Sequence, residues 1–242
     1  RLQWILDDAV ARGEIPGATL LVRKDGKEEV YLESGYADIE AKKPVARDSI
    51  YRLYSMSKPI TAVAVMLLAE RGQIDLADPV CRYLPGFCGQ MVAAADGHVE
   101  KPWRDVTIQD LVNMTSGLVY DGNHLTGKQT EALFTEVIQG LDEGEGGAYG
   151  TVEIANCLGQ IPLAFQPARS WCYGTSADVA GALVEVVSGM RFGDFLEKEI
   201  FTPLEMVDTG FWVPEEKQSR LVKTYECNEG KPSVLYTGNH LG

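Results

Sequence analysis

Apolar positions near the N-terminus change from a helical spacing to the denser runs that are typical of strands. A helix is predicted over residues 1–12, ended by Gly13, because apolar side chains recur on one helical face: Leu2, Ile5, Leu6, Ala9 and Val10. Two runs rich in Val, Leu and Tyr, residues 18–23 and 29–34, then flank Asp25-Gly26. Asp-Gly between apolar runs is typical of a tight hairpin turn, so the runs are predicted to pair as antiparallel strands.

The most apolar segment, residues 60–69, has almost no polar face. A helix that is apolar on every side packs inside a protein, so this run is predicted to be a buried central helix. Pro59 suits the first turn of a helix, where its missing N–H costs nothing, and Gly72 supplies a C-terminal stop. The helix is therefore expected to begin near Pro59 and to end before Gly72.

The rest of the pattern is mainly helical. Thr107 and Asp110 have the spacing of a capping box and predict a short helix ahead of Thr115-Ser116-Gly117. Thr151 is expected to cap a helix that runs through Leu158. Further segments follow from spacing and glycine content: helices over 129–140, 178–188 and 195–201, and a surface loop over 142–147.

The hairpin lacks the further strands that a stable sheet requires, because beyond Trp212 the segments are short and weakly patterned. Either the sheet is very small or its other strands lie outside this chain. The second interpretation is favoured, since an exposed apolar strand edge promotes aggregation. The pattern predicts an α+β fold, with an α/β part over 1–76 that holds the helix, hairpin and apolar helix, and a mainly helical part over 77–242.

Ser55 and Lys58 stand directly before the apolar helix. Residues three apart lie on one helical face, so the hydroxyl and the ammonium are expected side by side. Desolvation or a nearby positive charge can lower the pKa of a lysine until it accepts a proton, which would give the serine a base and make it nucleophilic. The helix N-terminus would stabilise a developing oxyanion. The alternative is that the serine only caps the helix.

Composition and charge narrow the classes of function. A net charge of −13 without a basic stripe argues against nucleic acid and anionic membranes, and no apolar stretch is long enough for a transmembrane segment. The five cysteines lack C-x-x-C spacing and the three histidines lack H-E-x-x-H, so no disulfide framework, metal site or cofactor is indicated. Reduced cysteines favour the cytoplasm, and the start at Arg1 leaves open that a signal peptide was removed.

Six segments in order resemble the serine β-lactamase-like family, which includes class C β-lactamases, penicillin-binding proteins, D-aminopeptidases and related esterases. They are 51–58, 76–80 with 83–85, 106–111 with 115–118, 171–174, 185–189, and 203–206 with 208–211. The resemblance implies a β-lactamase/transpeptidase-like fold, an α/β sandwich with an antiparallel sheet beside a mainly helical region. The family's C-terminal third, with further strands and a helix, is expected to be absent from this chain.

This resemblance implies that Ser55 is the acylated nucleophile and that Lys58 is its hydrogen-bonded partner. It also implies that Tyr173, as tyrosinate or through the lysine, takes the proton of the serine and later gives it to the leaving group. Lys58 is expected to lower the pKa of the Tyr173 phenol. Without the family, Tyr173 is an ordinary half-buried aromatic. Thr175 stands where the second motif commonly has asparagine, which argues against strong β-lactam hydrolysis. Thr175 and Trp171 are the predicted substrate contacts. A tryptophan two residues before the tyrosine, as at position 171, resembles the esterase branch of the family.

In the family the third motif, Lys-Thr-Gly or its His-x-Gly and Trp-x-Gly variants, lies on a strand of the C-terminal third, and this strand is expected to lie beyond Gly242. In the family it supplies one N–H of the oxyanion hole, so the chain alone is expected to be nearly inactive, with the missing C-terminal part of the same protein as its partner. The predicted function is a serine hydrolase that forms an acyl-enzyme with small ester or amide substrates, including β-lactams and D-amino-acid peptides. The alternative is a non-catalytic ligand-binding or sensor homologue. An α/β-hydrolase is disfavoured, because residues 174–178 fail the last position of G-x-S-x-G.

Overall fold

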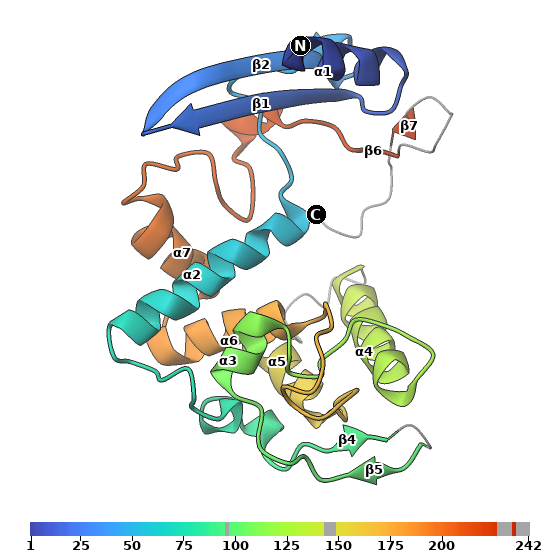
Figure 1. The fold of residues 1–242 in the computed structure, drawn as a ribbon, viewed down its shortest axis with the longest axis vertical. Helices are drawn as coiled ribbons and strands as arrows, with labels where there is room; N and C mark the ends of the chain where they lie inside the picture. Colours follow the sequence, from blue (N-terminus) through green and yellow to red (C-terminus); the bar gives the residue numbers. More distant parts are fainter. Residues whose placement is uncertain (95–96, 143–148, 227–233, 236–242) are drawn as a thin grey trace. The chain divides into compact units, whose positions relative to one another are not determined.

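The computed structural model describes residues 1–94, 97–142, 149–226 and 234–235 (Figure 1). The chain divides into two compact units, residues 1–54 with 210–242 and residues 55–209. This division differs from the predicted boundary at residue 76, because the apolar helix packs with the later helices and the C-terminal segment returns to the N-terminal sheet. Most of the predicted loop 142–147 lies outside the described residues, as do Cys227 and His240.

The first unit is built on an antiparallel sheet in the order β1-β2-β3, with strands β1 (Gly17–Lys24), β2 (Lys27–Asp38) and β3 (Lys43–Pro44). Helix α1 (Leu2–Ala11) packs against β2 (Figure 1). The predicted hairpin is confirmed: Asp25 and Gly26 both have positive φ, of 50° and 75°, which is the backbone that such a tight turn requires.

The C-terminal segment completes this unit. Leu221 forms a parallel bridge with Ile50 just after the 3₁₀ helix η5 (Glu215–Arg220), and strand β6 (Tyr225–Glu226) pairs with β7 (Val234–Leu235). The Tyr225 hydroxyl accepts a hydrogen bond from the Ile39 N–H at 2.7 Å. These contacts, rather than further long strands, hold the described end of the chain.

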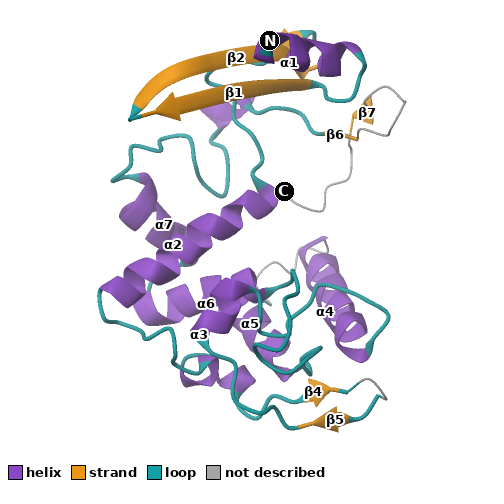
Figure 2. Cartoon of the chain, in the orientation of Figure 1, coloured by secondary structure: helices purple, strands orange, loops and turns teal. Residues whose placement is uncertain are grey.

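The second unit is mainly helical (Figure 2). Its α-helices are α2 (Ser57–Glu70), α3 (Ile108–Asn113), α4 (Leu125–Asp142), α5 (Thr151–Gln160), α6 (Ser176–Ser188) and α7 (Phe192–Leu196). Short elements join them: the 3₁₀ turns η1 (Tyr54–Met56), η2 (Val80–Arg82) and η3 (Pro85–Phe87), the π-helical turn η4 (Glu197–Phe201), and the paired strands β4 (Val92–Ala93) and β5 (Val99–Glu100).

The start of α3 follows its sequence signal, whereas the start of α5 does not. The capping box of α3 is confirmed, since the Asp110 N–H donates to Thr107 Oγ1 and the Thr107 N–H donates to Asp110 Oδ2. The predicted cap of α5 is wrong, because Gly150 is the N-cap and Thr151 is the first helical residue. An extended glycine takes the cap position there, which leaves the threonine side chain without a capping role.

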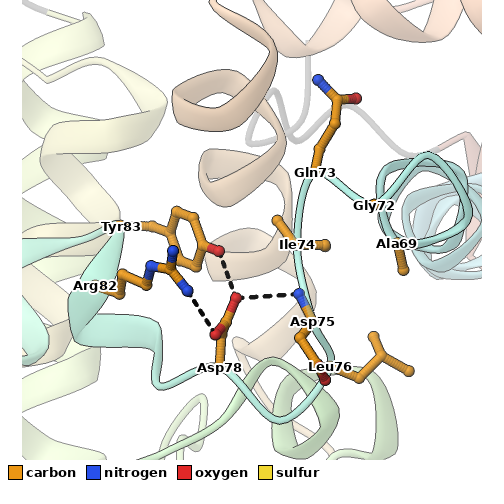
Figure 3. Close-up of a pocket in the computed structure, with 9 residues that line it drawn as sticks. All are labelled: Ala69, Gly72, Gln73, Ile74, Asp75, Leu76, Asp78, Arg82 and Tyr83. Atoms are coloured by element: carbon orange, nitrogen blue, oxygen red, sulfur yellow. Dashed lines mark hydrogen bonds and ion pairs between the residues drawn. The ribbon is translucent and has the colours of Figure 1, made fainter.

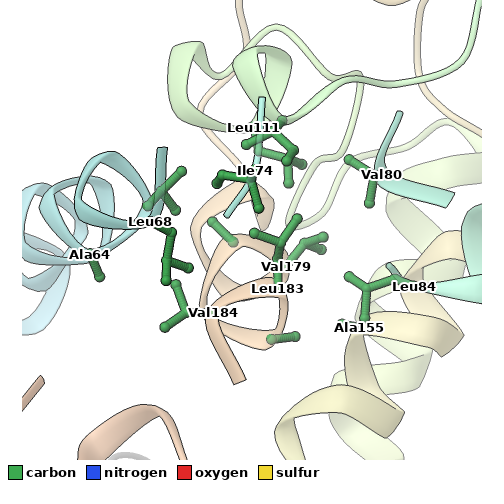
Figure 4. Close-up of a cluster of buried hydrophobic side chains, with 14 of the residues drawn as sticks. Ala64, Leu68, Ile74, Val80, Leu84, Leu111, Ala155, Val179, Leu183 and Val184 are labelled. Carbon is green, nitrogen blue, oxygen red and sulfur yellow. The ribbon is translucent and has the colours of Figure 1, made fainter. Parts of the chain in front are cut away.

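The core of the second unit lies where α2, α3, α5 and α6 converge (Figure 4). Leu68 of α2 and Leu183 of α6 are fully buried there. The prediction that α2 is buried on every side is wrong, since Val63 and Met66 are 48% and 47% exposed. One face of α2 packs on α6, and the opposite face retains solvent contact in the described structure. In the described part of the chain, every helix is too short or too polar to cross a bilayer.

Candidate active site

Ser55 and Lys58 lie side by side at the start of α2, as their spacing predicts. Ser55 sits in the 3₁₀ turn η1 that leads into the helix, and Lys58 is the second helical residue. The Lys58 ammonium donates a hydrogen bond to Ser55 Oγ at 3.0 Å. The Ser55 hydroxyl makes no capping hydrogen bond to α2, whose N-cap is Met56. The interpretation of Ser55 as a helix cap is therefore wrong.

Two tyrosines from other loops complete the cluster around this lysine. The Lys58 Nζ lies 4.7 Å from the ring centroid of Tyr173 and 5.4 Å from that of Tyr120. The two rings are 5.9 Å apart and tilted at 53°. Tyr173 also interacts with Ser55 through a side-chain hydrogen bond. The structure thus brings together the three predicted residues Ser55, Lys58 and Tyr173, and adds Tyr120.

The ammonium of Lys58 is held in its charged form. Burial favours the neutral amine, but hydrogen bonds with Tyr120 and Tyr173 outweigh this effect and raise the pKa of Lys58 above its ordinary value. The sequence-based expectation that the pKa of this lysine is lowered is wrong. The reason is that its neighbours are phenols, which favour the cation, rather than another positive charge.

The two phenols have pKa values shifted in opposite directions. Hydrogen bonds from Ser55 and then from Lys58 lower the pKa of Tyr173 below its ordinary value. Burial raises the pKa of Tyr120, and the hydrogen bond with Lys58 offsets only part of that rise. When environments separate the pKa values of two neighbouring groups, the more acidic one is the better base near neutral pH. Tyr173 is therefore the phenol that more readily becomes a phenolate beside Ser55.

Close backbone packing fixes the loops that carry the tyrosines. A Cβ on Gly174 would lie 2.2 Å from the Leu118 carbonyl oxygen, so only glycine allows the two loops to approach this closely. Ser116 Oγ and Ser176 Oγ are fully buried and hydrogen-bonded at 2.9 Å. Glycine and a buried serine pair thus set the position of Tyr173 relative to Tyr120.

The two predicted substrate contacts lie in different surroundings. Trp171 is 67% exposed, two residues before Tyr173. Thr175 is fully buried, and in the described structure its Oγ1 has no hydrogen-bond partner. The hydroxyl of Thr175 is therefore not presented at the surface beside Ser55, and a role of either residue in substrate binding stays a prediction.

Sequence reasoning missed Tyr120 and Asp178. Tyr120 follows Thr115–Leu118, a segment of the family resemblance, so the motif ended two residues short of this tyrosine. Asp178, in the first turn of α6, keeps solvent access, but the surrounding protein desolvates its carboxyl and raises its pKa, while the Lys58 ammonium opposes that rise. It adds a carboxyl within electrostatic range of the lysine.

A separate hollow lies at the other end of α2, between Ala69 and η2 (Figure 3). Its polar centre is the carboxylate of Asp78, which accepts hydrogen bonds from the Tyr83 hydroxyl at 2.6 Å, from Arg82 at 2.8 Å and from the Asp75 N–H at 3.0 Å. These donors hold the carboxylate in the charged form and lower its pKa. The carboxylate therefore anchors the turn η2, and Ser55 is not part of this hollow.

Comparison with known proteins identifies the family of this chain. A family model described as Beta-lactamase matches residues 2–241. The chain belongs to the β-lactamase family. A curated relative of this family, Esterase EstB from Burkholderia gladioli, is 34% identical over 238 residues, which are 98% of this chain and 57% of the relative.

Two solved structures extend the β-lactamase-family comparison. EstCE1, a hydrolase with promiscuous acyltransferase activity, has a TM-score of 0.79 at 28% identity, over 96% of this chain and 58% of the other. D-amino acid amidase from Ochrobactrum anthropi has a TM-score of 0.67 at 25% identity, over 93% and 55% of the two chains. The family fold is therefore shown, and the chain spans somewhat more than half the length of these proteins.

Proposed function

We propose that this chain carries the nucleophile and the general base of a serine hydrolase that forms an acyl-enzyme on Ser55. The observation that carries the proposal is the cluster in which one ammonium, Lys58, contacts the Ser55 hydroxyl and the two phenols. A nucleophile within hydrogen-bond reach of a base, with a third group that orients both, is the general pattern of activated serines.

The proton path follows from the opposite pKa shifts of the tyrosines. The Tyr173 phenolate removes the proton from Ser55 Oγ as this oxygen attacks the carbonyl carbon of the substrate. A carbon–oxygen bond forms, and the carbonyl electron pair moves to its oxygen. Collapse of this intermediate expels the leaving group, which takes the proton from Tyr173. Water then attacks the acyl-Ser55 by the same path in reverse, and the free acid leaves.

Lys58 contributes charge and position rather than proton transfer. Its raised pKa keeps it cationic, so it favours the phenolate of Tyr173 and holds the Ser55 hydroxyl at 3.0 Å. Ser55 precedes the N-terminus of the 14-residue helix α2, whose dipole favours negative charge at that end. The oxyanion of the intermediate is therefore stabilised near the same end of the helix.

Small esters are the favoured substrates. EstB is named an esterase, and EstCE1 is described as a hydrolase with acyltransferase activity. Amides are also proposed as substrates, since the D-amino acid amidase shares the fold. Thr175 in place of the usual asparagine, with its hydroxyl buried, removes an amide that would hold a lactam or peptide carbonyl. This supports ester cleavage over β-lactam cleavage.

The burial of Thr175 also favours a second candidate function. A homologue that has lost part of its substrate-binding motif can keep the fold as a ligand-binding or sensor protein. Such a protein would bind a peptide-like ligand without breaking any bond. The exposed Trp171 near the cluster would then serve as a stacking surface for the ligand.

The test compares turnover with binding. Hydrolysis of p-nitrophenyl acetate and of nitrocefin is measured for the complete gene product and, in parallel, for the 242-residue chain, because the chain covers little more than half the length of its relatives. Ester turnover by the gene product that Ser55→Ala abolishes and Ser57→Ala preserves supports the hydrolase. Calorimetric binding of acetyl-D-alanyl-D-alanine that survives Ser55→Ala, without turnover of either substrate, supports the sensor and overturns the hydrolase.

A further inference from the structure

A pair of cysteines, Cys81 and Cys88, lies outside the cluster of Ser55, Lys58, Tyr120 and Tyr173. Cys81 is the middle residue of η2, and Cys88 directly follows η3. The Cys88 thiol donates a hydrogen bond to the Cys81 carbonyl oxygen at 3.5 Å, so its sulfur lies against the residue that carries the other thiol. The sequence spacing indicated no disulfide, because the pairing depends on two consecutive 3₁₀ turns that bring residues seven apart together.

The turns that carry the two thiols are firmly held. Val80 and Leu84 are fully buried in the core, and Phe87 is 3% exposed. On the solvent side, the Asp78 carboxylate binds Arg82 and the neighbouring tyrosine hydroxyl (Figure 3). The backbone between the cysteines is therefore fixed on both sides, and the approach of the thiols follows from the fold.

Both thiols are open to a reagent, to different extents. Cys88 is exposed, whereas Cys81 is partly buried. Burial, followed by the hydrogen bond with Cys88, raises the pKa of the Cys81 thiol. The more accessible Cys88 is therefore the thiol that meets an oxidant first, and Cys81 is placed to react second.

We propose that Cys81 and Cys88 form a dithiol modification site that a disulfide oxidant, such as glutathione disulfide, converts to an intramolecular disulfide. The Cys88 thiolate attacks one sulfur of the oxidant, whose S–S bond breaks to release one glutathione thiolate. The Cys81 thiolate then attacks the Cys88 sulfur of this mixed disulfide and displaces the second glutathione. The two protein protons end on the two glutathione thiols, so the protein is oxidised by two electrons and the glutathione is reduced by two.

The new bond would close a short loop around η3, which packs on α5. A disulfide across a loop of this size restricts the unfolded chain and raises the melting temperature by roughly 5–10 °C in a domain of this length. Disulfide formation would therefore stabilise the helical unit under oxidising conditions. This effect is independent of whether Ser55 is catalytic.

The direct test is peptide mapping after incubation of the reduced chain with glutathione disulfide. Trypsin cleaves after Arg82, between the two cysteines, so the disulfide joins two otherwise separate peptides, 72–82 and 83–104, at a mass two hydrogens below their sum. We expect this crosslinked pair, with a raised melting temperature that dithiothreitol reverses. Cys81→Ser and Cys88→Ser should each abolish both effects, whereas Cys157→Ser on α5 should keep them.

Two outcomes would overturn the proposal. In the first, both thiols remain fully alkylatable after oxidation of the wild-type chain. In the second, Cys88 stays as a stable mixed disulfide with glutathione and no crosslinked peptide forms. The serine variants are folded controls in this design, because their reduced-state melting temperature can be compared with that of Cys157→Ser before oxidant is added.

Discussion

The Nζ atom of Lys58 lies 3.0 Å from Oγ of Ser55, and the same ammonium faces the rings of Tyr173 and Tyr120 at 4.7 and 5.4 Å. One cation is therefore shared between the hydroxyl of Ser55, the proposed nucleophile, and two phenols. Because its pKa is raised, the lysine stabilises negative charge on its neighbours instead of removing their protons. The proposed division of labour, with Tyr173 as base and Lys58 as its electrostatic support, follows from this geometry.

Removing the hydroxyl of Tyr173 should affect acylation more than removing that of Tyr120. General-base catalysis contributes about 10²–10⁴-fold to a rate, so Tyr173→Phe should slow acylation of Ser55 by that order. Tyr120→Phe removes only one hydrogen-bond partner of the lysine and should cost about tenfold. Stopped-flow release of p-nitrophenol from the complete gene product measures both. Equal losses would refute the assignment of Tyr173 as the base.

The pH dependence of acylation should report the Tyr173 phenol. A general base acts when deprotonated, so the rate should rise with pH through a pKa below the ordinary value of 10.0. Lys58→Met removes the cation that favours the phenolate, so the rising limb should move to higher pH. A pH–rate profile for the two proteins tests this, and an unchanged limb in the variant would contradict the proposed role of the lysine.

Gly174 should tolerate no larger residue. In Gly174→Ala the new Cβ would meet the Leu118 carbonyl oxygen at 2.2 Å, so a loop must shift at a cost of about 1–3 kcal/mol in the free energy of unfolding. Gly140→Ala is the matched control, since no atom lies within 4 Å of its Cβ and alanine favours a helix by about 0.5–1 kcal/mol. Urea denaturation of both variants measures the difference. Equal stability would show that the loops adapt freely.

The ion pair between the exposed Arg104 and the buried Asp110 at the start of α3 should make the helical unit sensitive to acid. Burial of Asp110 opposes its charge, but hydrogen bonds from Arg104 and Thr107 outweigh burial and lower its pKa below the ordinary value of 3.8. Because the pKa of Asp110 is lower in the folded protein, its stabilising contribution is complete above the ordinary value of 3.8. The contribution is lost as the pH falls from 3.8 through the folded-state pKa.

Asp110→Asn should therefore lower the free energy of unfolding by about 2–3 kcal/mol at neutral pH, and by less as the medium becomes acidic. Asp105→Asn changes an exposed neighbour and should cost less than about 0.5 kcal/mol. Denaturation curves at several pH values measure both effects. A loss from Asp110→Asn that does not diminish in acid would show that the carboxylate charge is not what stabilises α3.

Local signals in the sequence predicted elements well where one residue type dictates one backbone state. Asp25-Gly26 gave the hairpin turn, and Thr107 with Asp110 gave the start of α3. Strand β3 was missed because its two residues are too few to show a period. The exposure of Val63 on α2 was also missed, since an all-apolar run does not reveal which face its neighbours cover.

In the candidate site too, contacts within one helix could be predicted from the sequence, whereas contacts between distant segments could not. The contact between Ser55 and Lys58 follows from helical spacing, whereas the approach of Tyr173 was available only from the family resemblance. Tyr120 could not be found, because it meets Lys58 only through the tertiary fold. The direction of the lysine's pKa shift could not be predicted without those phenols, since burial alone lowers the pKa and only the contacts reverse it.

The central claim is tested most directly by trapping the acyl-enzyme. The complete gene product is mixed with p-nitrophenyl acetate, quenched in acid within the first turnover, and analysed by intact mass and peptide mapping. The account predicts one acetyl group per molecule on Ser55, absent from Ser55→Ala and retained in Ser57→Ala. Acetylation that persists in Ser55→Ala, or hydrolysis without an adduct on Ser55 in the quenched wild-type protein, would contradict it.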